Sequence, residues 1–372
     1  MFTGKKVLVV TTTDNMIWQF LLPHIKYLED CGNTVECACN ETGFWFKEME
    51  NNGIKLHKVE FPRNPLSTKL LKSRKQLFKL VKENKYDLII CHQPVGGVMG
   101  RMAGHKFNIP VIYVAHGFHF YKGCPKKNLL YKCIEKHYSK YTDALVTMNE
   151  EDYQSAQNFK AKKVYKINGI GVDLEKYKLD ESFDCDTLRK EFGISENNFV
   201  IISVAELIKR KNSITLIKAV ERLKNSNIIL LLCGRGVLQD ELKKYVDEHN
   251  LSDRVKFLGY RKDVSHCIQI SNCLALASFH EGLPRCIMEA MCAGLPVVAS
   301  NIRGCKDLID VQQGGILCQP SNIDEFANAI KQIKENKTKQ KTMAEYNLQK
   351  VKQFSIISVL EQMKRVYEEI EI

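Results

Sequence analysis

The sequence lacks any apolar run long enough to cross a membrane. A spanning helix needs about 20 mostly apolar residues, whereas the first apolar stretch, Val7–Val10, follows Lys5 and Lys6 and ends at three threonines. That stretch is also too short for the core of a secretory signal. The 372 residues include 9 prolines and 21 glycines, which excludes a mainly low-complexity protein. We expect a cytoplasmic protein, with a peripheral position on the inner face of the plasma membrane as the alternative.

A metal-binding cysteine pattern is also missing. The 14 cysteines are thinly spread, and no CxxC pair occurs among them. Cys37 and Cys39 lie in an apparent strand, but no second pair completes a zinc set. The sequence therefore predicts reduced, mostly buried thiols and no metal site.

Positive charge is concentrated in the first half of the chain. The formal net charge is +12, and residues 1–169 carry 26 Lys and Arg against 15 Asp and Glu, while the remainder carries 29 against 28. Such an excess attracts lipid headgroups, nucleic acid or phosphorylated substrates. No zinc, RNP or helix-turn-helix signature accompanies the charge, so we expect no nucleic-acid partner. Solubility alone is the competing explanation.

Two segments, 66–85 and 121–138, contain much of this positive charge. The first has seven cations and one acid. Its apolar face is formed by Leu70, Leu71, Leu77, Phe78 and Val81. Both segments are suited to an anionic membrane surface. Alternatively, the first is a helix whose apolar face covers a sheet while its lysines face water, and the two interpretations are compatible.

Short apolar runs alternate with helical patterns through both halves of the chain. The runs contain no alternating polar residues, which is typical of parallel strands covered on both faces. We predict strands at Val7–Val10, Leu88–Cys91, Val111–Ala115, Ala144–Thr147, Lys163–Ile167, Val200–Val204, Ile228–Cys233, Val255–Phe257, Cys273–Ala277 and Pro296–Ala299. We predict helices at Phe20–Cys31, Leu66–Glu83 and Ile356–Ile370.

This alternation, repeated twice in a chain too long for one core, predicts an α/β protein of two doubly wound, Rossmann-like domains. The seam is expected at a glycine-rich turn that begins at Asn168. The N-terminal domain then spans 1–168 and is joined by a C-terminal helix, 355–372, that crosses back to it. The second domain spans 169–354.

The densest group of chemically suggestive residues lies in the segment 278–300, SFHEGLPRCIMEAMCAGLPVVAS. Glu281 follows a buried strand, and a short loop then leads into an amphipathic helix that contains Glu289. Open α/β sheets bind ligands at the carboxyl ends of their strands, and helix N-termini there attract phosphate. The eight-residue spacing places both carboxylates on one helical face, about two turns apart. Without further context, a capping Glu281 and a solvated Glu289 are the simpler interpretation.

The surrounding residues change that interpretation. The segment resembles the signature of glycosyltransferase family 4, the retaining nucleotide-sugar transferases of GT-B fold. The matching residues are Glu281, Gly282, Pro284, Glu289, Ala290, Gly294, Pro296, Val297 and Val298. The resemblance covers nearly the whole chain and implies two Rossmann-like domains with a cleft between them. It also implies a nucleoside-diphosphate sugar donor, usually of UDP, with no cofactor and no metal.

The resemblance also implies which residues bind the donor. Glu281 contacts the sugar near its reacting carbon, and Glu289 binds the ribose hydroxyls. Backbone amides of the segment Gly282, Leu283, Pro284 and Arg285, in which Pro284 itself has no N–H, reach sugar and phosphate. In IISVAELIKRKN (201–212), Lys211 matches the lysine that holds the diphosphate. Glu206 stands where the family commonly has arginine. Either Lys209 or Arg210 supplies the missing cation, or Glu206 faces away from the donor. Gly234 in LLCGRG and Gly259 in VKFLGYR complete the predicted donor side.

On the acceptor side the resemblance implies fewer residues. His116, in VAHGFHF (114–120), matches a catalytic histidine that touches the donor sugar and aligns the acceptor. Asp14 and Asn15 occupy a first loop where many relatives have glycines.

The predicted function is therefore retaining transfer of a sugar to a polyprenyl-diphosphate-linked or polysaccharide acceptor, as in bacterial capsule or exopolysaccharide synthesis. A nucleotide-sugar epimerase of similar fold is one alternative. A catalytically silent, membrane-associated partner is another, and Glu206 is its main support.

Overall fold

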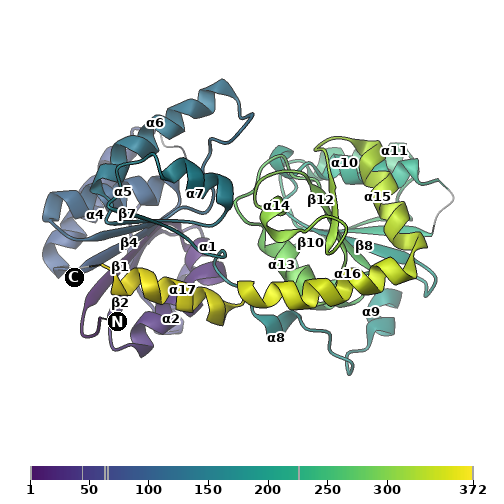
Figure 1. Cartoon of the computed structure of the whole chain (residues 1–372), viewed down its shortest axis with the longest axis horizontal. Coiled ribbons are helices and arrows are strands. Elements are labelled where there is room, and N and C mark those ends of the chain that lie inside the picture. Colours follow the sequence, from purple (N-terminus) through teal and green to yellow (C-terminus); the bar gives the residue numbers. More distant parts are fainter. Residues whose placement is uncertain (1, 44, 63, 65–66, 225–226, 371–372) are drawn as a thin grey trace. The chain divides into compact units, whose positions relative to one another are not determined.

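A computed structural model describes residues 2–43, 45–62, 64, 67–224 and 227–370 of the chain. The chain divides into two compact units (Figure 1). Unit 1 comprises Met1–Gly171 and Ile356–Ile372, and unit 2 comprises Val172–Ser355. The sequence analysis expected the changes of domain after residue 168 and before residue 355, within three residues of these bounds.

Unit 1 is built on a seven-stranded parallel sheet in the order β3-β2-β1-β4-β5-β6-β7. Its strands are β1 (Lys6–Thr13), β2 (Thr34–Asn40), β3 (Lys55–Lys58), β4 (Leu88–His92), β5 (Val111–Val114), β6 (Ala144–Thr147) and β7 (Lys163–Lys166). Its helices are α1 (Asp14–Met16), the π-helix η1 (Ile17–Leu21), α2 (Leu22–Asp30), α3 (Phe46–Asn51), α4 (Leu70–Asn84), α5 (Pro94–Phe107), η2 (Lys126–Asn128), α6 (Leu129–Tyr138), η3 (Ser139–Tyr141), α7 (Glu150–Ala156) and α17 (Ile356–Glu368).

Unit 2 repeats this design with a six-stranded parallel sheet in the order β10-β9-β8-β11-β12-β13. Its strands are β8 (Phe199–Val204), β9 (Ile228–Cys233), β10 (Val255–Gly259), β11 (Cys273–Leu276), β12 (Val297–Ser300) and β13 (Gly315–Cys318). Its helices are α8 (Leu174–Tyr177), α9 (Cys185–Glu191), η4 (Lys209–Lys211), α10 (Ser213–Arg222), α11 (Gln239–Glu248), α12 (Val264–Gln269), α13 (Arg285–Cys292), α14 (Cys305–Leu308), α15 (Ile323–Glu335), α16 (Lys337–Lys350) and η5 (Val351–Phe354).

The apolar strands are buried on both faces, as their sequence predicted. In β8, Val200 and Ile202 pack on one side of the sheet with residues of α13, whereas Phe199 and Ile201 pack on the other with residues of α10 and α15. Strands β3 and β13 were missed. The former has a lysine at each end and lies at a sheet edge, and the latter is a short apolar run that follows a glycine.

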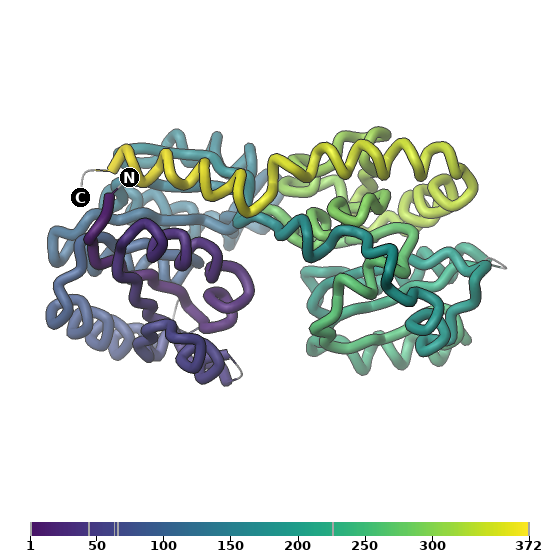
Figure 2. The backbone as a smooth tube through the Cα atoms, turned by 90° about the horizontal axis from the view of Figure 1, so that it is seen from below, coloured from purple at the N-terminus to yellow at the C-terminus, as the bar shows by residue number. Residues whose placement is uncertain are grey.

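The last helix belongs to unit 1. Figure 2 shows α17, in yellow, lying along this unit, and it contacts α2. The rings of Phe2 and Tyr367 meet edge to face with centroids 5.9 Å apart, so the first and last described parts of the chain adjoin. No described helix combines the length and the apolar character needed to cross a bilayer.

Each sheet has a point where the connections turn in opposite directions. These switch points lie between β1 and β4 in unit 1 and between β8 and β11 in unit 2. Parallel sheets leave room for a ligand beyond the carboxyl ends of the strands at such points. The loops that follow β8 and β11 carry Lys211 and Glu281, and the two loops are therefore neighbours.

Candidate active site

Hydrogen bonds join the loops after β8 and β11. The side-chain amide of Asn212 donates to the carbonyl of Ala277 at 3.1 Å. The amide of Phe279 donates to the carbonyl of Arg210 at 2.9 Å, and the Arg210 guanidinium donates to the carbonyl of His280 at 2.8 Å. Asn212 has a φ of 53°, a left-handed conformation that asparagine tolerates better than most residues. These hydrogen bonds fix the two loops against each other, so that Lys211 and Glu281, which are 70 positions apart in the sequence, lie side by side.

The centre of this arrangement is the buried carboxylate of Glu281, which is only 7% exposed. Lys211 Nζ donates to Glu281 Oε1 at 2.6 Å, and Arg210 Nη1 lies 3.4 Å from Oε2. Burial alone raises the pKa of a carboxyl group. Here the two cations outweigh burial, so the pKa of Glu281 is lowered and the group is ionised at neutral pH. The site therefore contains one anion between two cations at the end of a strand.

A second buried carboxylate, Glu289, lies on α13 and is 8% exposed. Arg285 Nε, one turn earlier on the same helix, is 3.0 Å from Glu289 Oε1. Burial, reinforced by the Glu289 charge, raises the pKa of the neighbouring Tyr177 hydroxyl. The sequence analysis did not single out Tyr177, because nothing near it in the chain resembles a motif.

The prediction that both carboxylates share one helical face was wrong. Helix α13 begins at Arg285, so Glu281 lies in the preceding loop, and each carboxylate has its own cations. The interpretation of Glu289 as a solvated side chain is also wrong, because both glutamates are buried. Proline and glycine between them keep the helix from starting earlier.

Backbone contacts explain two glycines near the site. A Cβ atom on Gly234 would lie 1.9 Å from the carbonyl oxygen of Ala205, in the loop after β8, and one on Gly304 would lie 2.2 Å from that of Gly282. The amide of Gly234 also donates to the carbonyl of Gly259 at 2.8 Å. Glycine at these positions lets the loop after β9 pack on the backbone of the loop after β8, and the loop after β12 pack on that of the loop after β11.

The start of α13 presents backbone N–H groups beside these loops. Pro284 precedes its first turn and makes no side-chain capping hydrogen bond, and Leu283 packs against the core. The first amides of a helix have no partner within the helix and favour an anion. Carboxylates, cations and helix amides at a switch point are suited to a sugar joined to a diphosphate.

Comparisons with known proteins identify the chain. Residues 184–350 match the family model described as glycosyl transferases group 1, and residues 6–149 match the model described as glycosyl transferase 4-like. EpsD of Bacillus subtilis (strain 168), named as a glycosyltransferase, is 31% identical over 98% of this chain and 96% of its own. The chain belongs to glycosyltransferase family 4. It is accordingly a transferase enzyme.

Two further relatives of this glycosyltransferase have more specific names. The UDP-Gal:alpha-D-GlcNAc-diphosphoundecaprenol alpha-1,3-galactosyltransferase of Escherichia coli is 30% identical over 90% of this chain and 88% of its own. The N,N'-diacetylbacillosaminyl-diphospho-undecaprenol alpha-1,3-N-acetylgalactosaminyltransferase of Campylobacter jejuni is 23% identical over 95% of this chain and 96% of its own.

Solved structures agree on the fold of the family 4 enzyme. The Anabaena protein HepE, solved in complex with UDP and glucose, superposes with a TM-score of 0.83 at 22% identity and covers 98% of this chain and 100% of its own. The fold is GT-B, as the sequence predicted.

Glu206, the unusual residue of this family member, does not take part in the cluster. Its side chain is exposed, and no ion pair joins it to a residue that the structure describes. Arg210, one of the candidates for the missing cation, lies beside Glu281. The sequence analysis overlooked Arg303, which is 6% exposed and lies 2.5 Å from His280 through its Nη2 atom.

The predicted acceptor-side residues of the transferase all lie at the carboxyl edge of the unit 1 sheet. Asp14 is fully buried, and its carboxylate accepts hydrogen bonds from the amides of Asn15, at 2.8 Å, and Thr42, at 3.0 Å, and from the Thr42 hydroxyl. Asp14 therefore ties the loops after β1 and β2 together. His116 follows β5 by two residues, and its Nε2 lies 2.9 Å from Nδ1 of His92.

Proposed function

We propose that this family 4 enzyme transfers a hexose from a UDP-sugar to a sugar carried on a polyprenyl diphosphate, with retention of the anomeric configuration. The observation that carries the proposal is the buried carboxylate of Glu281 held by Lys211 and Arg210 at the switch point of unit 2. A purely structural role for this ion pair would not explain why a helix N-terminus and closely packed glycine loops adjoin it.

The charges of this cluster match the charges that develop during transfer. As the bond between the sugar carbon and the diphosphate oxygen breaks, the carbon becomes positive and the diphosphate gains negative charge. Lys211, Arg210 and the first amides of α13 stabilise the leaving diphosphate, and preorganised groups of this kind lower the barrier. Glu281 orients the sugar and balances the positive carbon, while Glu289 accepts hydrogen bonds from the ribose hydroxyls.

The acceptor hydroxyl completes the exchange in this proposal. Its oxygen forms the new bond to the sugar carbon on the face that the diphosphate leaves, and its proton passes to the departing diphosphate. Residues of unit 1, His116 among them, align the hydroxyl. We further propose that no metal takes part, because Lys211 and Arg210 supply the positive charge that a divalent ion would otherwise contribute.

The names of relatives support the choice of donor and acceptor. Two of the relatives are named for acceptors on diphosphoundecaprenol, and one of these is named for UDP-Gal as donor. Both names state an alpha-1,3 product, and UDP-galactose is itself an α-glycoside, which supports retention.

Transfer can be tested with UDP-sugars and a soluble acceptor. The purified enzyme is incubated with UDP-galactose, UDP-glucose or their N-acetyl amino forms and with N-acetylglucosaminyl diphosphate linked to a short alkyl chain. We expect UDP release that depends on the acceptor, and an α-linked product by proton NMR. A β-linked product would contradict retention, and donor turnover without acceptor would favour an epimerase.

We also propose that unit 1 docks on an anionic membrane through an α6 surface, defined as the exposed residues Leu129, Leu130, Lys126, Lys127, Lys132 and Lys136. Leu129 and Leu130 are 53% and 54% exposed, and α6 stands at the edge of unit 1 (Figure 1). Exposed leucines flanked by lysines fit the boundary between acyl chains and anionic headgroups.

Helix α4 has a different role in this proposal. Its Leu77 and Val81 are buried in the core of unit 1, so its apolar face covers the sheet and its lysines face water. Position 66 of the predicted basic segment lies outside the described residues.

Vesicle sedimentation tests the α6 surface. We expect binding to vesicles containing phosphatidylglycerol, weak binding to pure phosphatidylcholine, and loss of binding in Leu129→Ser/Leu130→Ser. Leu71→Ser, on α4, is the control because Leu71 is 59% exposed yet lies outside the α6 surface. Equal binding by the double variant and the wild type would exclude this surface.

A further inference from the structure

Two histidines at the ends of neighbouring strands of unit 1 share a hydrogen bond. His92 is the last residue of β4, and His116 follows β5 by two residues. The Nδ1 atom of His92 lies 2.9 Å from Nε2 of His116, and their ring centroids are 5.2 Å apart. The sequence analysis singled out only His116, because the pairing of β4 with β5 is a property of the sheet.

The backbone fixes both rings in place. After His92, Gln93 adopts a φ of 63° and its side-chain oxygen accepts a hydrogen bond from the amide of Thr12 at 2.8 Å. On either side of His116, the amide of Ala115 donates to a carbonyl of β6 at 2.8 Å and that of Phe118 donates to the Asp152 carboxylate at 2.9 Å. His92 itself is only 5% exposed. The pair is therefore held by the sheet and by rigid turns.

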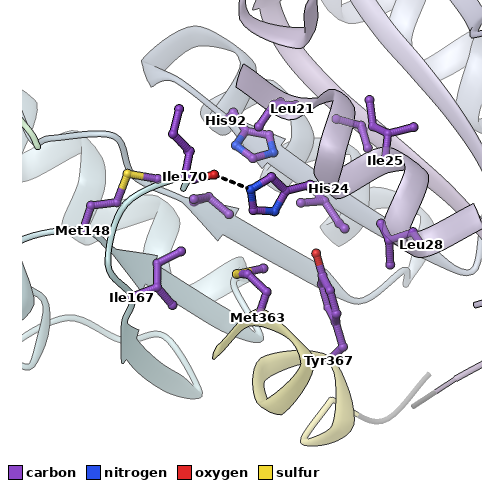
Figure 3. A pocket seen from close by; sticks show the side chains of 13 residues that line it. Leu21, His24, Ile25, Leu28, His92, Met148, Ile167, Ile170, Met363 and Tyr367 are labelled. Atoms are coloured by element: carbon purple, nitrogen blue, oxygen red, sulfur yellow. Dashed lines mark hydrogen bonds between the residues drawn. The ribbon is translucent and has the colours of Figure 1, made fainter. Parts of the chain in front are cut away.

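A third histidine, His24 of α2, lies next to this pair. Figure 3 shows His24 and His92 together on the wall of an internal cavity of unit 1. His24 Nε2 is 2.9 Å from the carbonyl of Ile170, and since a carbonyl only accepts, this nitrogen carries the proton. Burial, followed by the repulsion between the rings, lowers the pKa of His92 well below its usual range and that of His116 to about 3. The rings are neutral at physiological pH.

A neutral imidazole has one donor and one acceptor nitrogen. The bond to His92 uses Nε2 of His116, and Nδ1 of His116 has no hydrogen-bond partner among the described residues. We infer that His92 is a positioning residue, which turns the His116 ring and restricts its tautomer so that Nδ1 faces the reacting groups. This inference rests on the proposed role of His116 in transfer.

Two substitutions at His92 separate positioning from packing. Asparagine at position 92 places a polar atom near the position of the His92 Nδ1 atom and preserves the hydrogen bond to His116. Leucine fills the same space but cannot make that hydrogen bond. We expect His92→Leu to lower kcat by about 10- to 100-fold, since small misplacements of a reacting group have effects of this size. The KM for the UDP-sugar should stay within about threefold. His92→Asn should retain most of the rate.

His24→Leu is the matched control, because it removes another imidazole that lines the same cavity and leaves the hydrogen bond between His92 and His116 in place. We expect it to keep kcat within about threefold when its melting temperature shows a folded protein. Equal rates for His92→Leu and wild type, or equal losses in His92→Leu and His24→Leu, would overturn the inference. His116→Ala tests the proposed function separately: a full rate in that variant removes the role of His116 whatever His92 does.

A spectroscopic measurement covers the case in which His92→Leu does not fold. Long-range proton–nitrogen spectra of wild-type enzyme labelled with 15N-histidine report the tautomer of each ring, and the His116 signals are assigned by their absence in His116→Gln. We expect a single tautomer for His116. An average of both tautomers in the folded wild type would overturn the inference.

Discussion

Removal of the Lys211 ammonium group should affect stability and catalysis by separable amounts. In Lys211→Met, the Glu281 carboxylate remains buried, with 8% of its side chain exposed, and its remaining cation is Arg210 at 3.4 Å. Breaking a buried pair from one side costs about 3–5 kcal/mol. Since Arg210 is still present, we expect the lower value, about 3 kcal/mol. For a unit of this size the change corresponds to a fall in melting temperature of roughly 6–12 °C.

The double variant Lys211→Met/Glu281→Gln separates the two effects. It contains neither charge, so its free energy of unfolding should return to within about 1 kcal/mol of wild type. The transfer rate should not recover, because the leaving diphosphate still lacks the Lys211 cation and the sugar now lacks the Glu281 carboxylate. Loss of one such stabilising group lowers kcat by about 100- to 1,000-fold.

The measurements are urea unfolding of each variant and initial rates of UDP release at saturating donor. Lys244 and Glu248 on α11 form the matched control, since they also make an ion pair, at 3.7 Å, but their side chains are 75% and 59% exposed. Lys244→Met and Lys244→Met/Glu248→Gln should leave rate and stability nearly unchanged. Recovery of the rate in the site double variant would refute the reasoning, because Lys211 would then serve only to neutralise Glu281.

Three further predictions concern stability, a glycine loop and metal ions. Burial raises the pKa of Glu36, but hydrogen bonds from Lys55, Tyr86, His57 and Lys6 overcome it and lower the value from 4.5 to about 2. A carboxyl group with a lowered pKa stabilises the folded state at pH values above its unfolded pKa, and this stabilisation is lost as the pH falls. Glu36→Gln should therefore destabilise unit 1 by about 3 kcal/mol at pH 7, and by progressively less in denaturation curves recorded from pH 5 towards pH 2. A difference in stability that does not change with pH would contradict this assignment. Gly234→Ala should lower the free energy of unfolding by at least about 2 kcal/mol, because its Cβ would lie 1.9 Å from a carbonyl oxygen. Gly193→Ala is the control: Gly193 has a φ of +66° and nothing within 4 Å of its Cβ position, so this change should cost only about 1–2 kcal/mol. Equal losses in the two variants would show that the positive φ, and not the close contact, sets the cost at Gly234. An excess of EDTA should leave the rate of UDP release unchanged, and a loss restored by Mg²⁺ would disprove metal-independent transfer.

Local sequence patterns predicted much of the fold. The runs Val200–Val204 and Ile228–Cys233 predicted strands that the structure has to within one residue, since a buried parallel strand is a short apolar run whatever its neighbours are. Segments of mixed composition were harder. The edge strand β3 has an exposed lysine at each end and two partly buried residues between them, so it contains no apolar run to reveal it.

The family resemblance of the motifs also named candidate site residues. The motifs alone point to Glu281, Glu289 and Lys211, and the structure buries both glutamates and brings Lys211 to Glu281. The spacing was misleading where geometry mattered, because a count of eight residues assumed a helix that begins only at Arg285.

The sequence by itself thus determined which segments become strands and helices and which loops carry charged groups. Only the tertiary structure decided three contacts: Lys211 donates a hydrogen bond to Glu281, Thr42 donates to Asp14, and His92 shares a hydrogen bond with His116. The physical reason is the range of the forces involved. Hydrophobic periodicity and turn preferences act over a few residues, whereas the order of strands in a sheet is set by packing both of its faces at once.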